Sequence, residues 1–259
     1  MDFGFWSLAF GLGILDFGVH LRWLEGFKFR SQSKTKGQSP KTKGQSSKVK
    51  ARLVNMLRIG LTGSIGVGKS FVSSVFADLG CHLLDADQTS REVVMQGTAS
   101  LDAVSEAFGG EGLLEDGTLD RQRLASIVFA DEEKRLRLNA ILHPYIIARQ
   151  DEILREWERE DPEGIGIVDA ALMIESGGFR RFDKLIVVHC RPDVQLERLM
   201  LRDRLTMLEA QKRIASQMSQ EEKKKFADYL IDTSDGFEPT RTRTVEVYND
   251  LLRLRRTQG

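Results

Sequence analysis

Two glycines, a lysine and a serine stand at the spacing G-x-x-x-x-G-K-S in one short stretch, which reads Gly63, Ser64, Ile65, Gly66, Val67, Gly68, Lys69, Ser70. Glycines let the backbone turn tightly and aim several N–H groups at one point, where an anion can be held. The lysine can reach the β- and γ-phosphates of a nucleotide, and the serine hydroxyl can ligate Mg²⁺. The stretch therefore predicts a phosphate-binding loop for a nucleoside triphosphate, and we include the next residue, Phe71, in that loop.

The segments on either side of this loop have the patterns of a strand and a helix. The apolar run Leu57–Thr62 precedes it, and the amphipathic run Lys69–Leu79 follows it. A helix that begins near Lys69 adds the positive end of its dipole to the phosphate site. A flexible glycine-rich turn that binds nothing is the alternative, but a strand before and a helix after are the context that the motif requires.

Two aspartates two residues apart follow the next apolar run. Cys81–Leu84 predicts a second strand, and Asp85 and Asp87 lie at its carboxyl end. In an extended segment both carboxylates lie on one side, where one can orient an acceptor hydroxyl or accept its proton and the other can help to hold Mg²⁺. The alternative is structural, since Asp87 also stands where the N-cap of a helix over Thr89–Gln96 is expected. The spacing alone does not decide between these roles.

Asp169 and three arginines are further charged candidates near the strand ends. Asp169 closes a predicted strand at 164–170, where an acid can contact the magnesium shell, and a polar strand terminus is the alternative. Arg198 and Arg202 share one face of a helix, and Arg204 lies nearby. These arginines could close over the nucleotide and stabilise charge on a transferred phosphoryl group. Ion pairs with acids of the same helix are the alternative.

From Met56 onward the pattern alternates apolar strands with helices. Strands are predicted near 57–62, 81–84, 164–170, 184–189 and 229–231, and helices near 69–79, 89–96, 101–108, 121–129, 132–158, 206–219 and 238–255, with one more helix that begins at Pro192. Strands this apolar between helices imply an α/β fold with a doubly wound, five-stranded parallel sheet, and ligands bind beyond the carboxyl ends of such strands. Pro144 is expected to kink or break the long helix. The charged run Glu221–Lys225 is expected to be a solvated helix face.

Composition limits the class of protein and its partners. The chain has 259 residues, of which 41% are hydrophobic and 29% charged, as in a soluble globular protein. Its net charge of zero hides an asymmetry: residues 1–55 hold ten Lys/Arg and three Asp/Glu, which leaves 28 basic and 35 acidic residues in the rest. An acidic main body argues against nucleic acid as a partner. Cys81 and Cys190 lie in or beside apolar runs, so we expect reduced, buried thiols in a cytoplasmic protein.

The first 55 residues differ from the rest. The apolar run Phe3–Leu15 is interrupted by glycines and is shorter than the roughly 20 residues that a membrane helix needs, so no stable membrane insertion is expected. The sequence Lys-Thr-Lys-Gly-Gln-Ser then occurs twice, at 34–39 and 41–46, in a polar segment that cannot bury enough apolar surface to fold. We expect residues 1–55 to be a disordered or weakly structured extension, dispensable for the domain that begins at Met56. A weak anchor or targeting arm is the alternative.

With these pieces assembled, residues 56–236 resemble the dephospho-coenzyme A kinase family of phosphate-loop proteins. The resemblance rests on the loop with its preceding strand and on the stretches Ala77-Asp78-Leu79-Gly80, Asp85-Ala86-Asp87, Arg91-Glu92-Val93-Val94, Leu119-Asp120-Arg121, Val128-Phe129, Ile141-Leu142-His143-Pro144, Val168-Asp169, Arg198-Leu199, Arg213-Ile214 with Gln217, and Ala227-Asp228. Many families share the phosphate loop. Asp-Ala-Asp followed by an arginine and then His-Pro, in this order, is far more selective.

The resemblance implies an organisation and a reaction. It implies a parallel-sheet core at 56–87, 164–197 and 227–259, a helical acceptor-binding insertion at 88–163 and a lid at 198–226. The implied reaction moves the γ-phosphoryl group of ATP, with Mg²⁺, to the ribose 3′-hydroxyl of dephospho-coenzyme A, the last step of coenzyme A synthesis. The implied residue roles are a catalytic Asp87, lid arginines, metal contacts from Ser70 and Asp169, and acceptor contacts from Asp85, Asp87, Arg91, Arg121 and His143. Taken alone, Arg91, Arg121 and His143 would be surface charges and a structural histidine.

Three departures from the family pattern lie near the site. The loop Ala170–Glu175 reads Ala-Ala-Leu-Met-Ile-Glu where Ile-Pro-Leu-Leu-Phe-Glu is usual, so the missing proline is expected to leave it freer. Phe71 replaces a common threonine. The lid has Arg204 where glycine is usual, and the added charge is expected to alter lid opening. None of these changes removes a phosphate or magnesium ligand.

Three other functions are alternatives to this reaction. The first is a kinase for another nucleotide or nucleoside, and the second is a GTP-binding switch. The switch would need a guanine-reading Asn-Lys-x-Asp stretch, and no asparagine in this chain is followed by lysine. The third is a nucleotide-binding protein without turnover, for which the altered Ala170–Glu175 loop is the support. The sequence predicts no oligomeric state.

Overall fold

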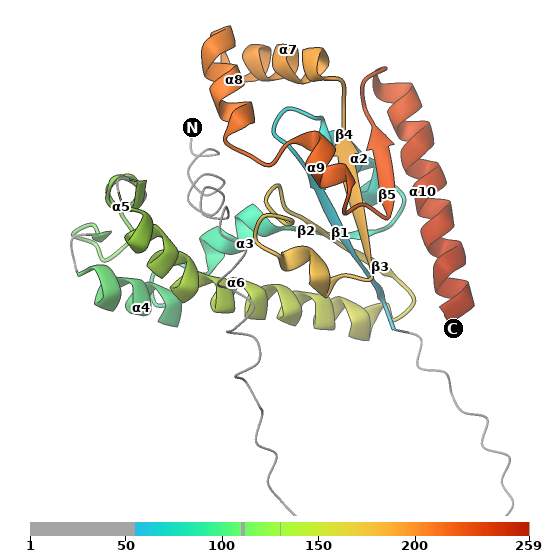
Figure 1. The fold of residues 1–259 in the computed structure, drawn as a ribbon. Helices are drawn as coiled ribbons and strands as arrows, with labels where there is room; N and C mark the ends of the chain where they lie inside the picture. Colours follow the sequence, from blue (N-terminus) through green and yellow to red (C-terminus); the bar gives the residue numbers. More distant parts are fainter. Residues whose placement is uncertain (1–54, 110–111, 130, 259) are drawn as a thin grey trace, which may run out of the picture.

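Five parallel strands form one sheet at the centre of the fold (Figure 1). The computed structural model describes residues 55–109, 112–129 and 131–258, so the predictions for the first 54 residues lie outside the described part. The strand order is β2-β3-β1-β4-β5, with β1 at Leu57–Gly63, β2 at His82–Asp85, β3 at Ile165–Asp169, β4 at Lys184–His189 and β5 at Tyr229–Asp232. Every neighbouring pair is parallel, which confirms the predicted fold class.

Both faces of this sheet are covered. Helices α2 (Lys69–Asp78) and α10 (Phe237–Gln258) enclose one buried cluster with the central strands. On the other face, the second half of α6 (Glu132–Glu160) and the segment 170–182, which includes the short 3-10 helix η3 (Gly178–Arg181), form a second cluster. The central strands are buried on both sides, which is why their sequences read as apolar runs rather than as alternating patterns.

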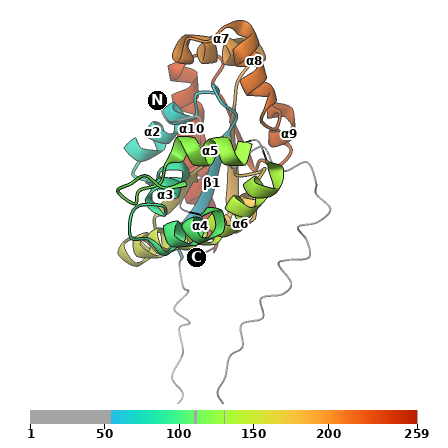
Figure 2. The same ribbon diagram turned by 90° about the vertical axis from the view of Figure 1, so that its left-hand side faces the viewer.

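Helices fill most of the region between β2 and β3. They are α3 (Ala86–Glu92), α4 (Ala99–Phe108), α5 (Arg121–Phe129) and α6, and they face the viewer in Figure 2. Their apolar sides enclose a core of their own, built from Val93, Val94, Leu101, Val104, Leu119, Leu124, Val128, Leu138 and Leu142. α3 begins three residues before the predicted Thr89, directly after β2.

Helix α6 runs unbroken from Glu132 to Glu160 although Pro144 lies within it. A proline inside a helix costs about 3 kcal/mol through a lost hydrogen bond and a steric clash. Apolar side chains on both sides of the proline offset this cost, since Leu138 and Leu142 pack into the helical core and Leu154 packs against the sheet. Of the kink or break expected at Pro144, the break is therefore wrong.

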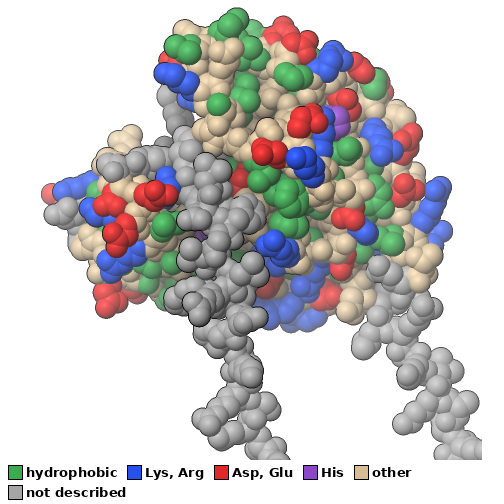
Figure 3. All heavy atoms as spheres, in the orientation of Figure 1, with side chains coloured by type: hydrophobic (Ala, Val, Ile, Leu, Met, Phe, Trp, Pro, Cys, Tyr) green, Lys and Arg blue, Asp and Glu red, His purple; other side chains and the backbone are tan. Residues whose placement is uncertain are grey.

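Three helices lie between β4 and β5: α7 (Pro192–Asp203), α8 (Met207–Ala215) and α9 (Gln220–Lys224). Thr206 caps α8 and Ser219 caps α9, each through a capping box with a glutamate three residues on. The helix predicted over 206–219 is α8, which ends at Ala215, four residues before the predicted end. Ser219 then caps a separate helix, α9, over the charged run that was expected to form a helix face. Hydrophobic side chains gather at this end of the molecule (Figure 3), including the exposed Leu201, Met207 and Leu208.

The charged run at 221–225 is not a fully solvated helix face. Glu221, Glu222 and Lys225 are exposed, but the side chain of Lys223 is completely buried. A one-turn helix laid on the core turns one of its residues inward, and sequence composition does not reveal which one. No helix among the described residues has both the length and the apolar character needed to cross a membrane.

Candidate active site

The register of the sheet brings the predicted loop and two of the predicted acids to one edge. Asp169 is paired with Leu61 of β1 on one side and with Asp85 of β2 on the other. The phosphate loop leaves β1 at Gly63, two residues beyond Leu61. Because all of these strands are parallel, their carboxyl ends meet at the same edge, where ligands of such sheets bind.

The glycines of the loop have separate physical roles. Gly66 and Gly68 adopt positive φ angles of 79° and 83°, which L-residues rarely adopt. Gly63 is required for packing, since a Cβ there would lie 2.6 Å from the carbonyl oxygen of Val188 on β4. Gly68 is also the N-cap of α2, and no side chain caps that helix end. The first-turn N–H groups of α2 therefore point toward the position of an anion.

Residues far away in the sequence hold the backbone of the loop. The Ile65 N–H donates to Gln217 Oε1 at 2.8 Å, and Gln195 Nε2 donates to the Ile65 carbonyl at 2.7 Å. Thr233 Oγ1 donates to the Val67 carbonyl at 2.6 Å. Gln195 and Thr233 belong to no recognisable motif, and they are 130 and 166 residues from their loop partners.

Lys69 and Asp169 form an ion pair at the base of the loop. Ser73, one turn further along α2, donates to the second carboxylate oxygen of Asp169 at 2.7 Å. Burial lowers the pKa of Lys69 to about 8, while the charges of Asp87 and Asp85 act in the opposite direction. The lysine is thus a desolvated cation among carboxylates, and bound phosphates would favour its charged form.

Asp85 and Asp87 have different roles in the local structure. Asp85 is the N-cap of α3, and its Oδ1 accepts hydrogen bonds from the N–H groups of Asp87 and Gln88 at 2.8 and 3.2 Å. The interpretation of Asp87 as the cap is therefore wrong, because the helix begins earlier than its sequence pattern suggests. Burial, and then the charge of Asp85, raise the pKa of Asp87, while Lys69 and Arg91 lower it.

The three arginines that were predicted to act from a lid have different surroundings. Arg198 donates two hydrogen bonds to Thr233, and its Nη1 lies near Gly68 of the loop, 3.3 Å from where a Cβ would stand. Arg202 lies farther along α7 and binds both carboxylate oxygens of Asp203, at 2.8 and 3.1 Å. Arg204 ends α7 in the left-handed conformation, with φ 54°. The structure thus brings Arg198, but not the Arg202 ion pair, to the phosphate loop.

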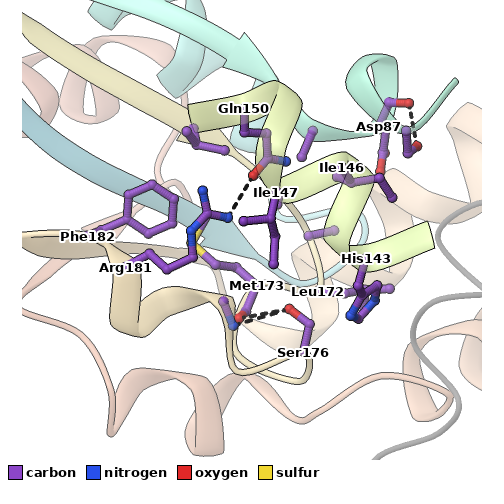
Figure 4. A pocket seen from close by; sticks show the side chains of 16 residues that line it. Asp87, His143, Ile146, Ile147, Gln150, Leu172, Met173, Ser176, Arg181 and Phe182 are labelled. Atoms are coloured by element: carbon purple, nitrogen blue, oxygen red, sulfur yellow. Dashed lines mark hydrogen bonds between the residues drawn. The ribbon is translucent and has the colours of Figure 1, made fainter. Parts of the chain in front are cut away.

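A pocket of about 770 Å³, its open mouth included, lies beside this edge of the sheet. Asp87 and His143 line one side of it, and Arg181 and Phe182 line the other (Figure 4). Its walls are largely apolar, with Ile146, Ile147, Leu172 and Met173 among them. Arg181 is held by Gln150 at 3.0 Å and by Asp151 at 2.5 Å.

Two other predicted acceptor contacts lie on the helices of this region. Arg91 is in the last turn of α3 and acts electrostatically on Asp87. Arg121 is the first residue of α5 and is half-buried. The pocket therefore joins Asp87 and His143, while Arg91 and Arg121 are placed on the neighbouring helices rather than in its lining.

The oxygen donors at the loop fit Mg²⁺ bound together with a triphosphate. Across the described residues, no group of three or more His, Cys, Asp or Glu side chains forms a ready-made metal centre. Mg²⁺ needs none, since it is usually held by one or two protein oxygens together with substrate phosphates and water. Ser70 is exposed in the first turn of α2, and Asp169 stands at the same edge of the sheet.

Comparisons with known proteins agree with this geometry. Residues 57–238 match the protein family described as dephospho-CoA kinase. Dephospho-CoA kinases of Bacillus licheniformis and Streptomyces avermitilis are 46% and 42% identical over 188 and 198 residues, which cover 71% and 76% of this chain and 91% and 95% of those proteins.

Two solved structures, each 27% identical in sequence, are also similar. A protein of Thermus thermophilus has a TM-score of 0.66 and covers 76% of this chain and 98% of its own. A dephospho-CoA kinase from Campylobacter jejuni has a TM-score of 0.51 and covers 75% and 96%. The resemblance expected from the motifs is confirmed by the family match and by these relatives: the chain belongs to the dephospho-CoA kinase family.

Proposed function

We propose that this chain transfers the γ-phosphoryl group of ATP to the ribose 3′-hydroxyl of dephospho-coenzyme A, which forms coenzyme A, and we assign roles to its residues. One observation carries the assignment: Asp87 lines the apolar pocket and also acts electrostatically on Lys69 of the phosphate loop. An acceptor hydroxyl bound beside Asp87 would therefore stand next to the end of a triphosphate held by the loop.

The donor half of the site is the loop from Gly63 to Phe71. Its backbone N–H groups and the first turn of α2 would hold the phosphates, and Lys69 would bind the β- and γ-phosphate oxygens. Arg198 stands close enough to Gly68 to neutralise charge that develops on the transferred group. Arg202 and Arg204, which are exposed on the predicted lid, would supply further positive charge to the transferred group, and Arg202 would have to leave its ion pair with Asp203 to do so.

Asp87 would accept a hydrogen bond from the 3′-hydroxyl and orient it toward the phosphorus. Burial raises the pKa of this carboxyl, which makes it a stronger base than a free aspartate of about pKa 4. A loose phosphoryl-transfer transition state needs little help from a base, so orientation would be its main task.

Ser70 and Asp169 are the residues that would hold Mg²⁺. When bound, the ion supplies positive charge at the β- and γ-phosphate oxygens. Asp169 already carries Lys69 and Ser73 as partners, so these two side chains would orient its carboxylate.

The acceptor half comprises the pocket and the helices around it. We assign Asp85, Arg91, Arg121 and His143 to the binding of dephospho-coenzyme A. His143 lines the pocket beside Asp87 and Arg91 acts on the Asp87 carboxyl, which supports both assignments. The apolar walls suit the long pantetheine arm of this acceptor, since pockets for such ligands combine apolar walls with few polar groups.

The partners that we propose are small molecules, ATP and dephospho-coenzyme A, without nucleic acid. A cytoplasmic location stays a prediction. It is supported by Cys81 and Cys190, which are buried and free of disulfides, as expected where thiols are kept reduced.

The test is the reaction itself, followed with the full chain, ATP, Mg²⁺ and dephospho-coenzyme A. Coenzyme A is the expected product, identified by mass spectrometry. Lys69→Ala and Asp87→Asn should each lower kcat by roughly a hundredfold or more, with circular dichroism like that of the wild type.

A folded wild-type protein that forms no coenzyme A would contradict the proposal. A panel of nucleosides and nucleotides as alternative acceptors tests specificity, and faster phosphorylation of any of them would assign the site to another substrate. ATP binding without turnover of any acceptor would identify a silent nucleotide-binding protein.

A further inference from the structure

A buried ion pair joins the last lid helix to the loop that lines the acceptor pocket. The side chains of Lys223 and Glu175 are 0% and 6% exposed, and Lys223 Nζ lies 2.8 Å from Glu175 Oε1 and 3.1 Å from Oε2. The same ammonium donates to the Ala171 carbonyl at 2.6 Å. An ammonium has three donors and no acceptor, so the hydrogen-bonding capacity of Lys223 is directed at one loop.

The Ala171 carbonyl connects this pair to the donor half of the site. It accepts a second hydrogen bond from Thr62 Oγ1 at 3.1 Å, and Thr62 directly precedes Gly63, the first residue of the phosphate loop. Ala171 and Leu172 belong to the wall of the pocket that contains Asp87. A carbonyl held from both sides fixes the position of this wall relative to the phosphate loop.

The returning end of the lid is attached to the same place. The Met218 N–H donates to Glu175 Oε1 at 3.3 Å, and Ser64 Oγ donates to the Met218 carbonyl at 3.4 Å. Glu175 thus receives a hydrogen bond from the segment before α9 and an ion pair from α9 itself. The predicted lid, the Ala170–Glu175 loop and the phosphate loop therefore meet at the Glu175 carboxylate and the Ala171 carbonyl.

Stability alone does not account for two charges in this position. Moving an ion pair out of water costs several kcal/mol per ion, and well-packed apolar residues of similar volume are often as stable or more stable. Burial lowers the pKa of Lys223, and the charge of Glu175 opposes this effect. An apolar pair would fill the space, but it would not hold the Ala171 carbonyl.

We propose that Lys223 and Glu175 are positioning residues for the acceptor, which hold the Ala170–Glu175 loop against the phosphate loop so that a hydroxyl beside Asp87 meets the γ-phosphoryl group. Neither side chain is part of the pocket lining that contains Asp87. The inference rests on the proposed function, because it concerns the acceptor half of the same site.

The test replaces the pair by apolar residues in the full chain, as Lys223→Met with Glu175→Leu. Its thermal midpoint is expected within about 5 °C of the wild type, since no charge is left buried alone. The KM for dephospho-coenzyme A is expected to rise about tenfold and kcat to fall about tenfold, because the pocket wall is displaced. The KM for ATP is expected to change less than about twofold, since Gln195, Gln217 and Thr233 hold the phosphate loop independently.

Lys225→Met is the matched control, because Lys225 is an exposed lysine two residues from Lys223. It is expected to leave both KM values and kcat unchanged. Lys223→Arg keeps the charge and should lie closer to the wild type than Lys223→Met. Glu175→Gln keeps the shape of the side chain and should show the same rise in the KM for dephospho-coenzyme A and the same fall in kcat. If the double variant fails to fold, Glu175→Gln tests the inference by itself.

Two outcomes would overturn the inference. One is a folded double variant, or a folded Glu175→Gln, with the wild-type kcat and KM for dephospho-coenzyme A. The other is an equal loss toward both substrates that follows the fraction of folded protein, which a merely structural pair would give. A wild-type chain that does not phosphorylate dephospho-coenzyme A would instead count against the proposed function.

Discussion

The guanidinium of Arg198 holds Thr233 through two hydrogen bonds, one to Oγ1 and one to the carbonyl oxygen, each 2.8 Å long. Thr233 Oγ1 in turn donates to the Val67 carbonyl in the phosphate loop at 2.6 Å. The buried hydroxyl of Thr233, directly after β5, therefore positions both the Arg198 guanidinium and the backbone of the phosphate loop.

Thr233→Val tests this connection, because valine has a similar shape but no hydroxyl. It leaves Arg198 Nη1 and the Val67 carbonyl without this partner, a loss of about 1–3 kcal/mol. We expect kcat/KM for ATP to fall by about tenfold to a hundredfold, with a smaller change in the KM for dephospho-coenzyme A. Thr233→Ser keeps the hydroxyl and serves as the control. Wild-type kinetics in a folded Thr233→Val protein would show that the hydroxyl does not position Arg198.

Asp87→Asn is expected to stabilise the fold at neutral pH while it abolishes most activity. The pKa of Asp87 is raised by burial and by the charge of Asp85, so ionisation of this carboxyl opposes folding. This destabilisation of the fold by ionised Asp87 is present at neutral pH. It disappears as the pH falls through the raised pKa of the folded state toward the pKa of about 4 that aspartate has in the unfolded chain. The thermal midpoint of Asp87→Asn should therefore exceed that of the wild type near neutral pH, and the difference should shrink on acidification.

Asp85→Ala should have the opposite effect on stability. Asp85 caps α3 through two backbone N–H groups, and loss of such a cap costs about 1 kcal/mol. Its thermal midpoint is expected below that of the wild type. If both aspartate variants shift the midpoint in the same direction, the separate roles assigned to the two carboxylates are incorrect.

Arg204→Gly is expected to raise stability by about 1 kcal/mol, because the left-handed conformation at the end of α7 costs an L-residue about that much. Arg204→Ala removes the same charge but keeps the strained conformation. The stability gain, measured by chemical denaturation, should appear only in the glycine variant. A loss of kcat that the two variants share would report the charge of Arg204 on the lid.

Ser70→Ala is expected to raise the Mg²⁺ concentration needed for half-maximal rate by about tenfold, because Mg²⁺ loses one oxygen ligand. A tenfold change corresponds to about 1.4 kcal/mol of binding free energy. Ser74→Ala is the matched control, since Ser74 lies four residues further along α2, is exposed, and donates only to the Phe71 carbonyl among the described contacts. Chelation of Mg²⁺ should stop turnover in every variant. An unchanged Mg²⁺ requirement in Ser70→Ala would remove Ser70 from the proposed metal site.

The sequence was sufficient for the features that depend on local pattern. The phosphate loop, the five strands and helices such as Arg121–Phe129 follow from glycine spacing and apolar periodicity, and the structure has them at or near the predicted bounds. Asp169 reaches the loop because it ends a strand that is paired with β1. That neighbourhood follows from the rule that parallel strands share a carboxyl edge.

The remaining features depend on contacts between distant segments. The burial of Lys223 is decided by Glu175 and Ala171, about fifty residues earlier, and nothing in the run 221–225 distinguishes it from its exposed neighbours. The missing proline at Ala171 was expected to leave the loop freer, yet its carbonyl is held by Thr62 and Lys223. Helix α3 starts before its apolar pattern does, because Asp85 caps it directly from the strand.

The predicted lid, residues 198–226, is hydrogen-bonded to the phosphate loop just before it begins and again beyond α8. Gln195 in α7 bonds to the Ile65 carbonyl, and Gln217 beyond α8 accepts from the N–H of the same residue. The segment from α7 to α8 is therefore held at two points on the phosphate loop rather than at a single hinge. Between these two points, Asp203 binds the guanidinium groups of Arg202 and Arg213. Any closing movement of this segment would therefore be confined to the part between its two hydrogen bonds to Ile65.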